Sequence, residues 1–402
     1  MKCGLLGHKL GHSYSPRIHA LLGNYAYELF EKEPEELADF LRNGDYAGIN
    51  VTMPYKKAVI PYLDLLTPEA QMLGAVNTIV RLGDKLIGHN TDYFGFRSLL
   101  QYSKLSPSGK KCLVLGSGGA SNVAVAVLQE LGAQVVVISR SGKHNYENLS
   151  AHADAAILVN TTPVGMYPNN GASSVDLDIF ANLEGVVDVI YNPAKTQLML
   201  DAECRGIPAF GGLRMLVAQA KAAAEWFGGK SIAEGAIDAV YTILRGEMEN
   251  IILVGMPGCG KSTVGRLVAE KSGRSFVDAD QEIEKLAGKS IPSIFAEDGE
   301  AVFRKLETLV LAELGKQSGL VIATGGGCIT NQCNYPLLHQ NGRVIWLQRD
   351  LEKLPTEGRP LSQAGSISEM YQKRAPLYEH FADFKIDNNG TIDDTVSAIL
   401  EV

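Results

Sequence analysis

The stretch IILVGMPGCGKST, residues 251–263, divides the chain and determines the fold of the part that follows it. Its first four residues are all apolar and predict a short buried strand. Residues 255–262 then match G-x-x-x-x-G-K-[ST], in which glycines turn backbone N–H groups into one concavity where a helix begins. Lys261 supplies a cation for terminal phosphates, and the Ser262 hydroxyl suits Mg²⁺. The stretch predicts a nucleotide-binding unit whose phosphate-binding residues are Gly258, Gly260, Lys261, Ser262 and Thr263.

The bulk composition limits the class of protein. A chain of 402 residues predicts two or three domains, and the net charge of −8 is spread over residues of both signs without a basic stripe, so we expect no nucleic-acid partner. No apolar run approaches the roughly 18 residues of a membrane helix, and the first residues lack a signal-peptide pattern. Six scattered cysteines have no metal-binding spacing and suit a reducing compartment. We therefore expect a cytoplasmic protein, monomeric or homodimeric, with no membrane partner.

Polar side chains gather in a loop near the start of the chain. Residues 2–7 predict a strand, and Ser13 and Ser15 then alternate around Tyr14, so that both hydroxyls would face one side of an extended loop. The alternative is that Ser15 simply caps the helix that Pro16 begins.

Further polar residues occur where predicted strands end. Residues 48–60 predict a strand that runs into a short helix, which places Thr52 and Lys56 at the carboxyl end of the strand, where α/β proteins bind ligands. Asn77 and Asp92 follow in short strand-and-turn segments, and Gln219 lies in a late helix. Three of these residues also have a purely structural interpretation. Lys56, beside Lys57, could be a solvated surface lysine; Asp92 could be the N-cap of a helix; and Gln219 could be a polar residue on the surface.

Residues 110–141 predict a strand, a glycine turn, a helix and a second strand. Gly116, Gly118 and Gly119 open the helix, and this βαβ spacing is typical of a dinucleotide site. The second strand ends in Ser139-Arg140-Ser141, with no acidic residue for a ribose 2′-hydroxyl. An arginine there suits a 2′-phosphate and favours NADP over NAD, although Arg140 also fits a solvated loop.

The part after the phosphate loop contains a second set of charged candidates. A strand is expected to end in Asp278 and Asp280, with alternation placing both carboxylates on one side. Arg304 and Glu307 lie one helical turn apart and fit an ordinary ion pair. Three glycines, 325–327, follow a buried strand and allow a ligand to approach the backbone.

Residues 2–245 resemble shikimate dehydrogenases. The matching motifs are HSYSP, NVTMPYK, GAVNTI, GHNTDYFGF, GSGGAS, NTTPVGM, YNP and MLVAQA, in the family's order. The resemblance implies that Lys56 and Asp92 are the catalytic pair. It implies a shikimate site formed by Ser13, Ser15, Thr52, Asn77, Asp92, Tyr191 and Gln219, and an NADP site formed by Gly116, Ser117, Gly118, Gly119, Ala120, Ser139, Arg140, Ser141, Met166 and Gly212. Arg214 stands where the family usually has glycine beside the nicotinamide, so we expect its bulk to disturb cofactor fit or domain closure.

Residues 250–401 are similar to shikimate kinases in the phosphate loop and in VDAD, GEAVFRKLE, TGGG, GRPL and RAPLY. The similarity implies that shikimate is bound by Asp280, Arg304, Gly326 and Arg374, and that Arg359 covers the ATP phosphates from a lid. It also implies that Ser262 and Asp278 hold Mg²⁺, and that Asp280 and Lys261 are catalytic. The lid is short and lacks an upstream arginine, so we expect Lys353 to take that place.

Together the resemblances imply an α/β protein. We expect a substrate domain at 1–104 with returning helices at about 213–245, a Rossmann NADP domain at 105–212, and a P-loop NTPase domain with a parallel sheet, like nucleoside monophosphate kinases, at 249–402. The implied function is NADPH-dependent reduction of 3-dehydroshikimate to shikimate, then ATP-dependent phosphorylation to shikimate 3-phosphate, on the route to chorismate and aromatic amino acids. The alternatives are a quinate/shikimate dehydrogenase fused to a different small-molecule kinase, or one half that binds ligand without catalysis.

Overall fold

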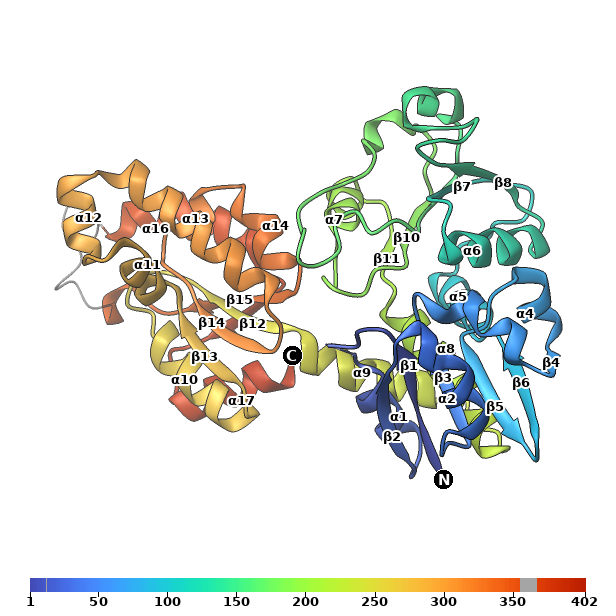
Figure 1. Cartoon of the computed structure of the whole chain (residues 1–402). Helices are drawn as coiled ribbons and strands as arrows, with labels where there is room; N and C mark the ends of the chain where they lie inside the picture. Colours follow the sequence, from blue (N-terminus) through green and yellow to red (C-terminus); the bar gives the residue numbers. More distant parts are fainter. Residues whose placement is uncertain (12, 355–366) are drawn as a thin grey trace. The chain divides into compact units, whose positions relative to one another are not determined.

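The computed structural model describes all residues except 12 and 355–366. The chain folds into two compact units. Unit 1 comprises residues 1–164, 173–191 and 201–245, and unit 2 comprises residues 165–172, 192–200 and 246–402. Figure 1 gives the element labels used below. Mixed and parallel sheets with helices on their faces confirm the α/β class.

The first sheet of unit 1 has six strands in the order β2-β1-β3-β5-β6-β4. These strands are β1 (Lys2–Gly7), β2 (Ala26–Glu31), β3 (Gly48–Val51), β4 (Leu65–Leu66), β5 (Thr78–Leu82) and β6 (Lys85–His89). Strand alternation separates two cores: Leu6 and Ile49 pack with α2 (Leu37–Asn43), whereas Cys3 packs with Phe227 of α8 (Leu213–Gly228). The sheet is therefore covered on both faces, and its strand ends remain available for a site.

The second sheet of unit 1 is parallel, in the order β11-β10-β9-β7-β8. Its strands are β7 (Lys111–Leu115), β8 (Gln134–Ile138), β9 (Ile157–Asn160), β10 (Gly185–Asp188) and β11 (Ala209–Phe210). Helix α6 (Gly119–Glu130) connects β7 to β8, as the glycine turn predicts, and its buried Val123, Val127 and Leu128 pack on the sheet. The helices not yet named in unit 1 are α1 (Ser15–Leu22), α3 (Tyr55–Ala58), α4 (Pro68–Leu73) and α5 (Asp92–Ser103); α7 (Gln197–Cys204) and α9 (Ala236–Met248) run across unit borders.

Unit 2 contains a five-stranded parallel sheet in the order β13-β14-β12-β15-β16. Its strands are β12 (Asn250–Val254), β13 (Ser275–Asp278), β14 (Leu320–Ala323), β15 (Gly342–Gln348) and β16 (Phe384–Asp387). In Figure 1, α10 (Lys261–Ser272) and α17 (Ile392–Glu401) cover one face, and α13 (Glu300–Lys316), α14 (Asn334–His339) and α16 (Ile367–Phe381) cover the other. Two further helices, α11 (Ala279–Ala287) and α12 (Ile291–Glu297), follow β13. The strand–loop–helix arrangement predicted from residues 251–263 is confirmed.

Two alternative interpretations and one expectation are wrong. Ser15 is not the N-cap of α1: it is the first helical residue, and the N-cap is Tyr14. Asp92 is likewise inside α5, whose N-cap is Thr91. Strand β13 ends at Asp278, which caps α11 by accepting a hydrogen bond from the Asp280 backbone N–H, so Asp280 lies on a helix and strand alternation does not apply to it.

No helix within residues 1–11, 13–354 and 367–402 is long and apolar enough to cross a membrane.

Candidate functional site

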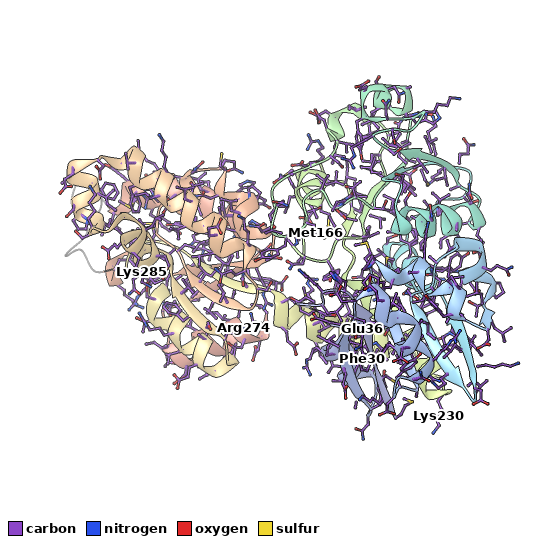
Figure 2. All side chains as sticks on the ribbon, in the orientation of Figure 1. Phe30, Glu36, Met166, Lys230, Arg274 and Lys285 are labelled. Carbon is purple, nitrogen blue, oxygen red and sulfur yellow. The ribbon has the colours of Figure 1, made fainter. Side chains whose placement is uncertain are left out.

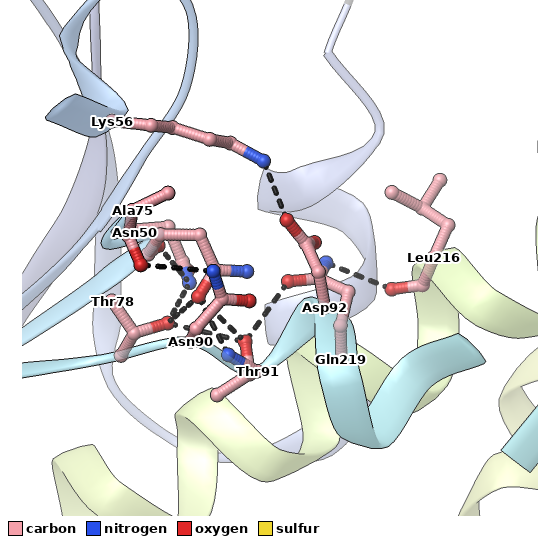
Figure 3. Close-up of polar contacts among 10 residues, drawn as sticks. Asn50, Lys56, Ala75, Thr78, Asn90, Thr91, Asp92, Leu216 and Gln219 are labelled. Atoms are coloured by element: carbon pink, nitrogen blue, oxygen red, sulfur yellow. Dashed lines mark hydrogen bonds and ion pairs between the residues drawn. The ribbon is translucent and has the colours of Figure 1, made fainter. Parts of the chain in front are cut away.

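A lysine and a carboxylate from separate elements meet in unit 1. Lys56 lies on α3 and Asp92 begins α5, and the Lys56 Nζ donates to Asp92 Oδ2 at 2.6 Å (Figure 3). The carboxylate is also favoured by the positive end of α5. Both side chains keep some exposure, 30% for Lys56 and 18% for Asp92. The pair is therefore charged, oriented and accessible to a ligand.

Hydrogen bonds beneath this pair fix the neighbouring amides. The Asn77 Oδ1 accepts from the Thr91 backbone N–H at 2.7 Å, and it also accepts from the hydroxyls of Thr91 at 3.2 Å and Thr78 at 3.1 Å. The Gln219 Oε1 accepts from Thr91 Oγ1 at 3.4 Å, while its Nε2 donates to Leu216 O at 2.9 Å. Gln219 reaches this network from α8, far along the sequence (Figure 3). Asn77, Asp92 and Gln219 are therefore brought together as the resemblance implies.

The early serine loop lies near the same network. The Ser13 Oγ accepts from the Ser15 N–H at 3.2 Å. Burial raises the pKa of the Tyr27 hydroxyl, and the nearby Ser15 side chain offsets part of that rise. The Tyr27 hydroxyl donates to Asn50 Oδ1 at 2.7 Å, and Asn50 Nδ2 donates to Thr78 Oγ1 at 3.1 Å. Sequence reasoning missed Tyr27, because a tyrosine in the edge strand β2 gives no signal of a role beneath a ligand site.

Thr52 and Tyr191, both predicted as substrate residues, lie at different points of unit 1. Thr52 follows β3, is half-buried, and its backbone N–H donates to Leu6 O at 2.9 Å. The Tyr191 ring packs edge-on against Tyr14, between the two serines, at 6.0 Å between ring centres. Burial raises the pKa of Tyr191, so its hydroxyl remains a neutral donor and acceptor.

A separate cavity lies beside the His89–Thr91 turn. It has a volume of about 690 Å³ and is lined by residues that include His89, Phe94 and Trp226. The Trp226 and His89 rings lie 3.9 Å apart. Lys56 and Asp92 do not line this cavity, so it is distinct from the site of their ion pair.

The glycine turn after β7 fits a dinucleotide phosphate. Gly116 has φ of +109°, a conformation that favours glycine, and a Cβ added there would lie 2.8 Å from Thr161 Oγ1. Cβ atoms added at Gly118 or Gly119 would meet nothing within 4 Å in the described part of the chain. Helix α6 therefore begins with its N–H groups facing open space, which is the geometry that binds phosphate.

The other predicted NADP residues lie in this turn or in other loops. Arg140 follows β8 and is exposed, with Ser139 and Ser141 beside it. Met166, labelled in Figure 2, lies on a loop of unit 2, and its side chain is exposed. Gly212 precedes α8, and a Cβ there would overlap the Val189 carbonyl, so this position requires glycine for packing alone. Ser117 and Ala120 lie in the turn itself.

Arg214, which we expected to disturb cofactor fit or domain closure, contacts two residues of unit 1. Its guanidinium forms an ion pair with Asp238 of α9 and stacks over the Tyr102 ring at 4.3 Å. Both partners belong to helices that close unit 1. The arginine therefore joins α5, α8 and α9.

In unit 2, a pocket of about 540 Å³ brings the predicted kinase residues together. Its lining includes Gly258, Gly260, Lys261, Ser262, Thr263, Asp278, Asp280, Arg304, Gly326 and Arg374. Arg359, predicted to cover the phosphates, lies outside the described residues. Lys353 is not among the residues that line the pocket, and it forms an ion pair with Asp350 at 3.3 Å.

The phosphate loop places a cation and two oxygen groups side by side. The Lys261 Nζ donates to the Gly255 and Met256 carbonyls at 2.8 and 3.1 Å. The Ser262 hydroxyl donates to Asp278 Oδ2 at 2.7 Å. A hydroxyl beside a carboxylate is a donor set that suits Mg²⁺, so these residues fit the metal that the resemblance implies.

Two carboxyls converge deeper in the pocket. A Cβ added at Gly325 would lie 2.8 Å from both Asp280 Oδ1 and Glu307 Oε1. Burial raises the pKa of each, and for Asp280 the neighbouring Asp278 acts in the same direction. Arg304 pairs with Glu307 at 2.8 Å, as helical spacing predicts, but Glu307 is only 1% exposed. Helical spacing alone could not place this ion pair in the pocket, although the resemblance to shikimate kinases implied that Arg304 belongs there.

The backbone carbonyl of Gly326 accepts two side-chain hydrogen bonds. Arg374 Nη1 donates to it at 3.1 Å and the buried Tyr378 hydroxyl at 2.5 Å. Arg374 is therefore positioned by a neutral partner, which leaves its charge available to an anionic ligand.

Comparisons with known proteins agree with both resemblances. A family model described as the shikimate dehydrogenase substrate binding domain matches residues 5–79, and one described as shikimate kinase matches residues 257–402. The chain is 36% identical over 267 residues to shikimate dehydrogenase (NADP(+)) of Clostridium beijerinckii, covering 61% of this chain and 98% of the relative.

Solved structures resemble the same part of the chain. A chorismate mutase/shikimate 5-dehydrogenase fusion protein from Clostridium acetobutylicum is 35% identical with a TM-score of 0.58, covering 60% of this chain and 96% of that one. A shikimate 5-dehydrogenase from Thermus thermophilus in complex with NADP(H) and shikimate is 30% identical with a TM-score of 0.55, covering 60% and 99%. This chain belongs to the shikimate dehydrogenase family and carries a shikimate kinase domain over residues 257–402.

Proposed function

We propose that the chain catalyses two consecutive reactions: reduction of 3-dehydroshikimate by NADPH, and transfer of the ATP γ-phosphoryl group to the 3-hydroxyl of the resulting shikimate. The observation that carries the first reaction is the Lys56–Asp92 contact of 2.6 Å above the network of Asn77 and Gln219. The second rests on the pocket that joins the phosphate loop to Asp280 and Arg304.

Lys56 is the proposed proton donor of the reduction. NADPH, when bound at the turn after β7, supplies the hydride. The Lys56 ammonium stabilises the negative charge that develops on the substrate carbonyl oxygen and transfers a proton to it, which yields the alcohol; solvent then reprotonates the amine. Asp92 orients the ammonium at 2.6 Å and accepts from a substrate hydroxyl. Ser13, Ser15, Thr52, Asn77, Tyr191 and Gln219 bind the other hydroxyls and the carboxylate.

Asp280 is the proposed base of the phosphoryl transfer. The shikimate 3-hydroxyl oxygen bonds to the γ-phosphorus, the bond from that phosphorus to ADP breaks, and the hydroxyl proton passes to Asp280. Lys261 would neutralise the bound phosphates, and Ser262 and Asp278 would hold Mg²⁺. Arg304 and Arg374 bind the shikimate carboxylate, a geometry that planar guanidinium groups favour.

A coupled assay tests both reactions. The full chain is supplied with 3-dehydroshikimate, NADPH, ATP and Mg²⁺, and each reagent is omitted in turn. We expect NADPH loss without ATP, and ADP formation only when 3-dehydroshikimate and NADPH are both present or shikimate is added. ADP formation that does not depend on shikimate would contradict the kinase assignment, and a preference for NADH with quinate would favour the quinate dehydrogenase alternative.

We further propose domain boundaries at residues 1–104 with about 213–245, 105–212 and 249–402, supported by the three separate sheets. Expression of residues 249–402 alone should retain shikimate-dependent ADP formation. Because the reactions consume NADPH and ATP, we place the enzyme in the cytoplasm. We propose that it is a monomer or a homodimer, and light scattering of the purified chain distinguishes these two states.

A further inference from the structure

Among the residues that the structure describes, four cations line the pocket of unit 2, and one differs from the others. Lys261 donates to two carbonyls, Arg304 pairs with glutamates that include Glu307, and Arg374 donates to the Gly326 carbonyl. Arg349 lines the same pocket and has neither a hydrogen bond nor an ion pair with any residue that the structure describes. Its Nε is moreover buried without a partner among those residues. No described acid therefore offsets its charge.

Arg349 is placed by the strand next to the phosphate-loop strand. It follows β15 (Gly342–Gln348), whose residues 342–346 pair with β12. Its Nη1 lies 3.8 Å from the position that a Cβ on Gly260 would take. Gly260 has φ of +99° and is the N-cap of α10, whose first N–H groups face the pocket. The guanidinium therefore lies at the helix end of the phosphate loop.

This end of the loop is held in place from a second side. The Asn388 Nδ2 donates to the Cys259 carbonyl at 2.6 Å, and the same nitrogen lies 2.9 Å from a Cβ added at Gly260. The loop backbone beside Arg349 is therefore held by a hydrogen bond from Asn388 and not by one from the arginine. A half-buried guanidinium without a polar partner is costly unless a ligand pairs with it.

Arg349 also lies at a different part of the pocket from the cations that are placed beside the phosphoryl acceptor, shikimate. Arg304 approaches Gly327 and Arg374 binds Gly326, at the glycines where we place shikimate. Lys261 extends towards the strand end of the loop, where a P-loop lysine meets the β- and γ-phosphates. Arg349 instead approaches Gly260, where the loop N–H groups hold the phosphates nearer the nucleoside.

We infer that Arg349 is a nucleotide-binding residue, which pairs with a phosphate common to ATP and ADP at the Gly260 end of the loop. This inference rests on the proposed kinase function and adds a residue that neither the phosphate-loop pattern nor the short lid predicts. It also assigns to Arg349 the place that we expected Lys353 to fill.

The experiment measures nucleotide binding to the full chain by titration calorimetry with ATP or ADP and Mg²⁺, without acceptor. Arg349→Met and Arg349→Gln should raise the Kd for ATP and for ADP alike, by roughly 10- to 100-fold for a lost charged hydrogen bond. Arg349→Lys, which keeps the charge, should show a smaller rise. Lys271→Met is the matched control, because it removes one positive charge from the last turn of α10, where Lys271 pairs with Asp393 on the surface. The control should bind both nucleotides like the wild type.

Several results would overturn the inference. Unchanged Kd values in both Arg349 variants would do so, and so would a loss for ATP alone, which indicates contact with the γ-phosphate instead. Loss of shikimate binding in both variants would mark a structural effect. A rise in Kd with Lys353→Met but not with the Arg349 variants would restore the original expectation. Because binding is measured without acceptor, a wild-type chain that binds ATP but does not phosphorylate shikimate refutes the proposed function and leaves this test intact.

Discussion

Replacing Lys56 by methionine should abolish most of the reductase activity while leaving the fold intact. The change removes the ammonium that lies 2.6 Å from the Asp92 carboxylate and keeps a side chain of similar length. Loss of a general acid typically lowers turnover roughly 10²- to 10⁴-fold, or about 3 to 5 kcal/mol of transition-state stabilisation. Asn77, Gln219 and their hydrogen bonds remain, so the KM for 3-dehydroshikimate should change much less than kcat.

The stability cost of the same change should be small. Lys56 and Asp92 both keep contact with solvent, so their ion pair contributes at most about 1 kcal/mol to folding. The backbone around Lys56 is held independently, because its carbonyl accepts from the Val76 N–H at 2.7 Å. The melting curve of Lys56→Met should therefore lie close to that of the wild type, which separates a catalytic loss from unfolding.

The assay follows NADPH absorbance at saturating and limiting 3-dehydroshikimate. Lys57→Met is the matched control, since Lys57 is the neighbouring lysine and its side chain is exposed; it should keep wild-type turnover. Kinase activity of the same preparations serves as an internal reference for protein concentration. If Lys56→Met retains near wild-type kcat, or if kcat and KM deteriorate equally in Lys57→Met, the role assigned to Lys56 is wrong.

Three further outcomes are expected. Gly327→Ala would place a Cβ 2.6 Å from Arg304 Nη1, so it should raise the kinase KM for shikimate but not for ATP, as steady-state kinetics would reveal. Since burial raises the pKa of Asp280, the base form is lost as pH falls through that raised value. Kinase kcat/KM should therefore decline at a pH above the roughly 3.9 of an ordinary aspartate, and a decline only near that value would argue against Asp280 as base. Arg214→Ala loses the Asp238 ion pair and the stacking on Tyr102, so chemical denaturation should show a loss of about 1 to 2 kcal/mol, with the KM for NADPH unchanged.

Local patterns predicted the elements well, because their causes are local. Four apolar residues before a glycine loop become β12, and the loop leads into α10 with Lys261 as its first residue. The glycine turn at Gly116 likewise separates β7 from α6. In each case, the residues that form the sequence pattern are the same residues that form the strand, the turn or the start of the helix.

The site residues of unit 1 could not be assembled from spacing. Lys56 and Asp92 meet only because β3, β5 and β6 bring their ends together, and Gln219 joins them from α8. Considered one at a time in the sequence, these three residues could each be explained as surface or helix-capping residues. Only the resemblance to a family grouped them into one site. The contacts of Arg214 could not be predicted for the same reason, because Asp238 and Tyr102 become its neighbours only on folding.

The buried carboxyl pair of unit 2 illustrates the limit most clearly. Helical spacing predicted that Arg304 would meet Glu307, and it does, at 2.8 Å. Helical spacing could not predict the part played by Gly325. Because this glycine has no side chain, Asp280 and Glu307 can approach the same point from different helices. Two carboxyls with raised pKa then face Lys261, Arg304 and Arg374 in one pocket. The charge balance on which phosphoryl transfer depends therefore arises from a contact between β14 and two helices, and is a property of the fold rather than of any single motif.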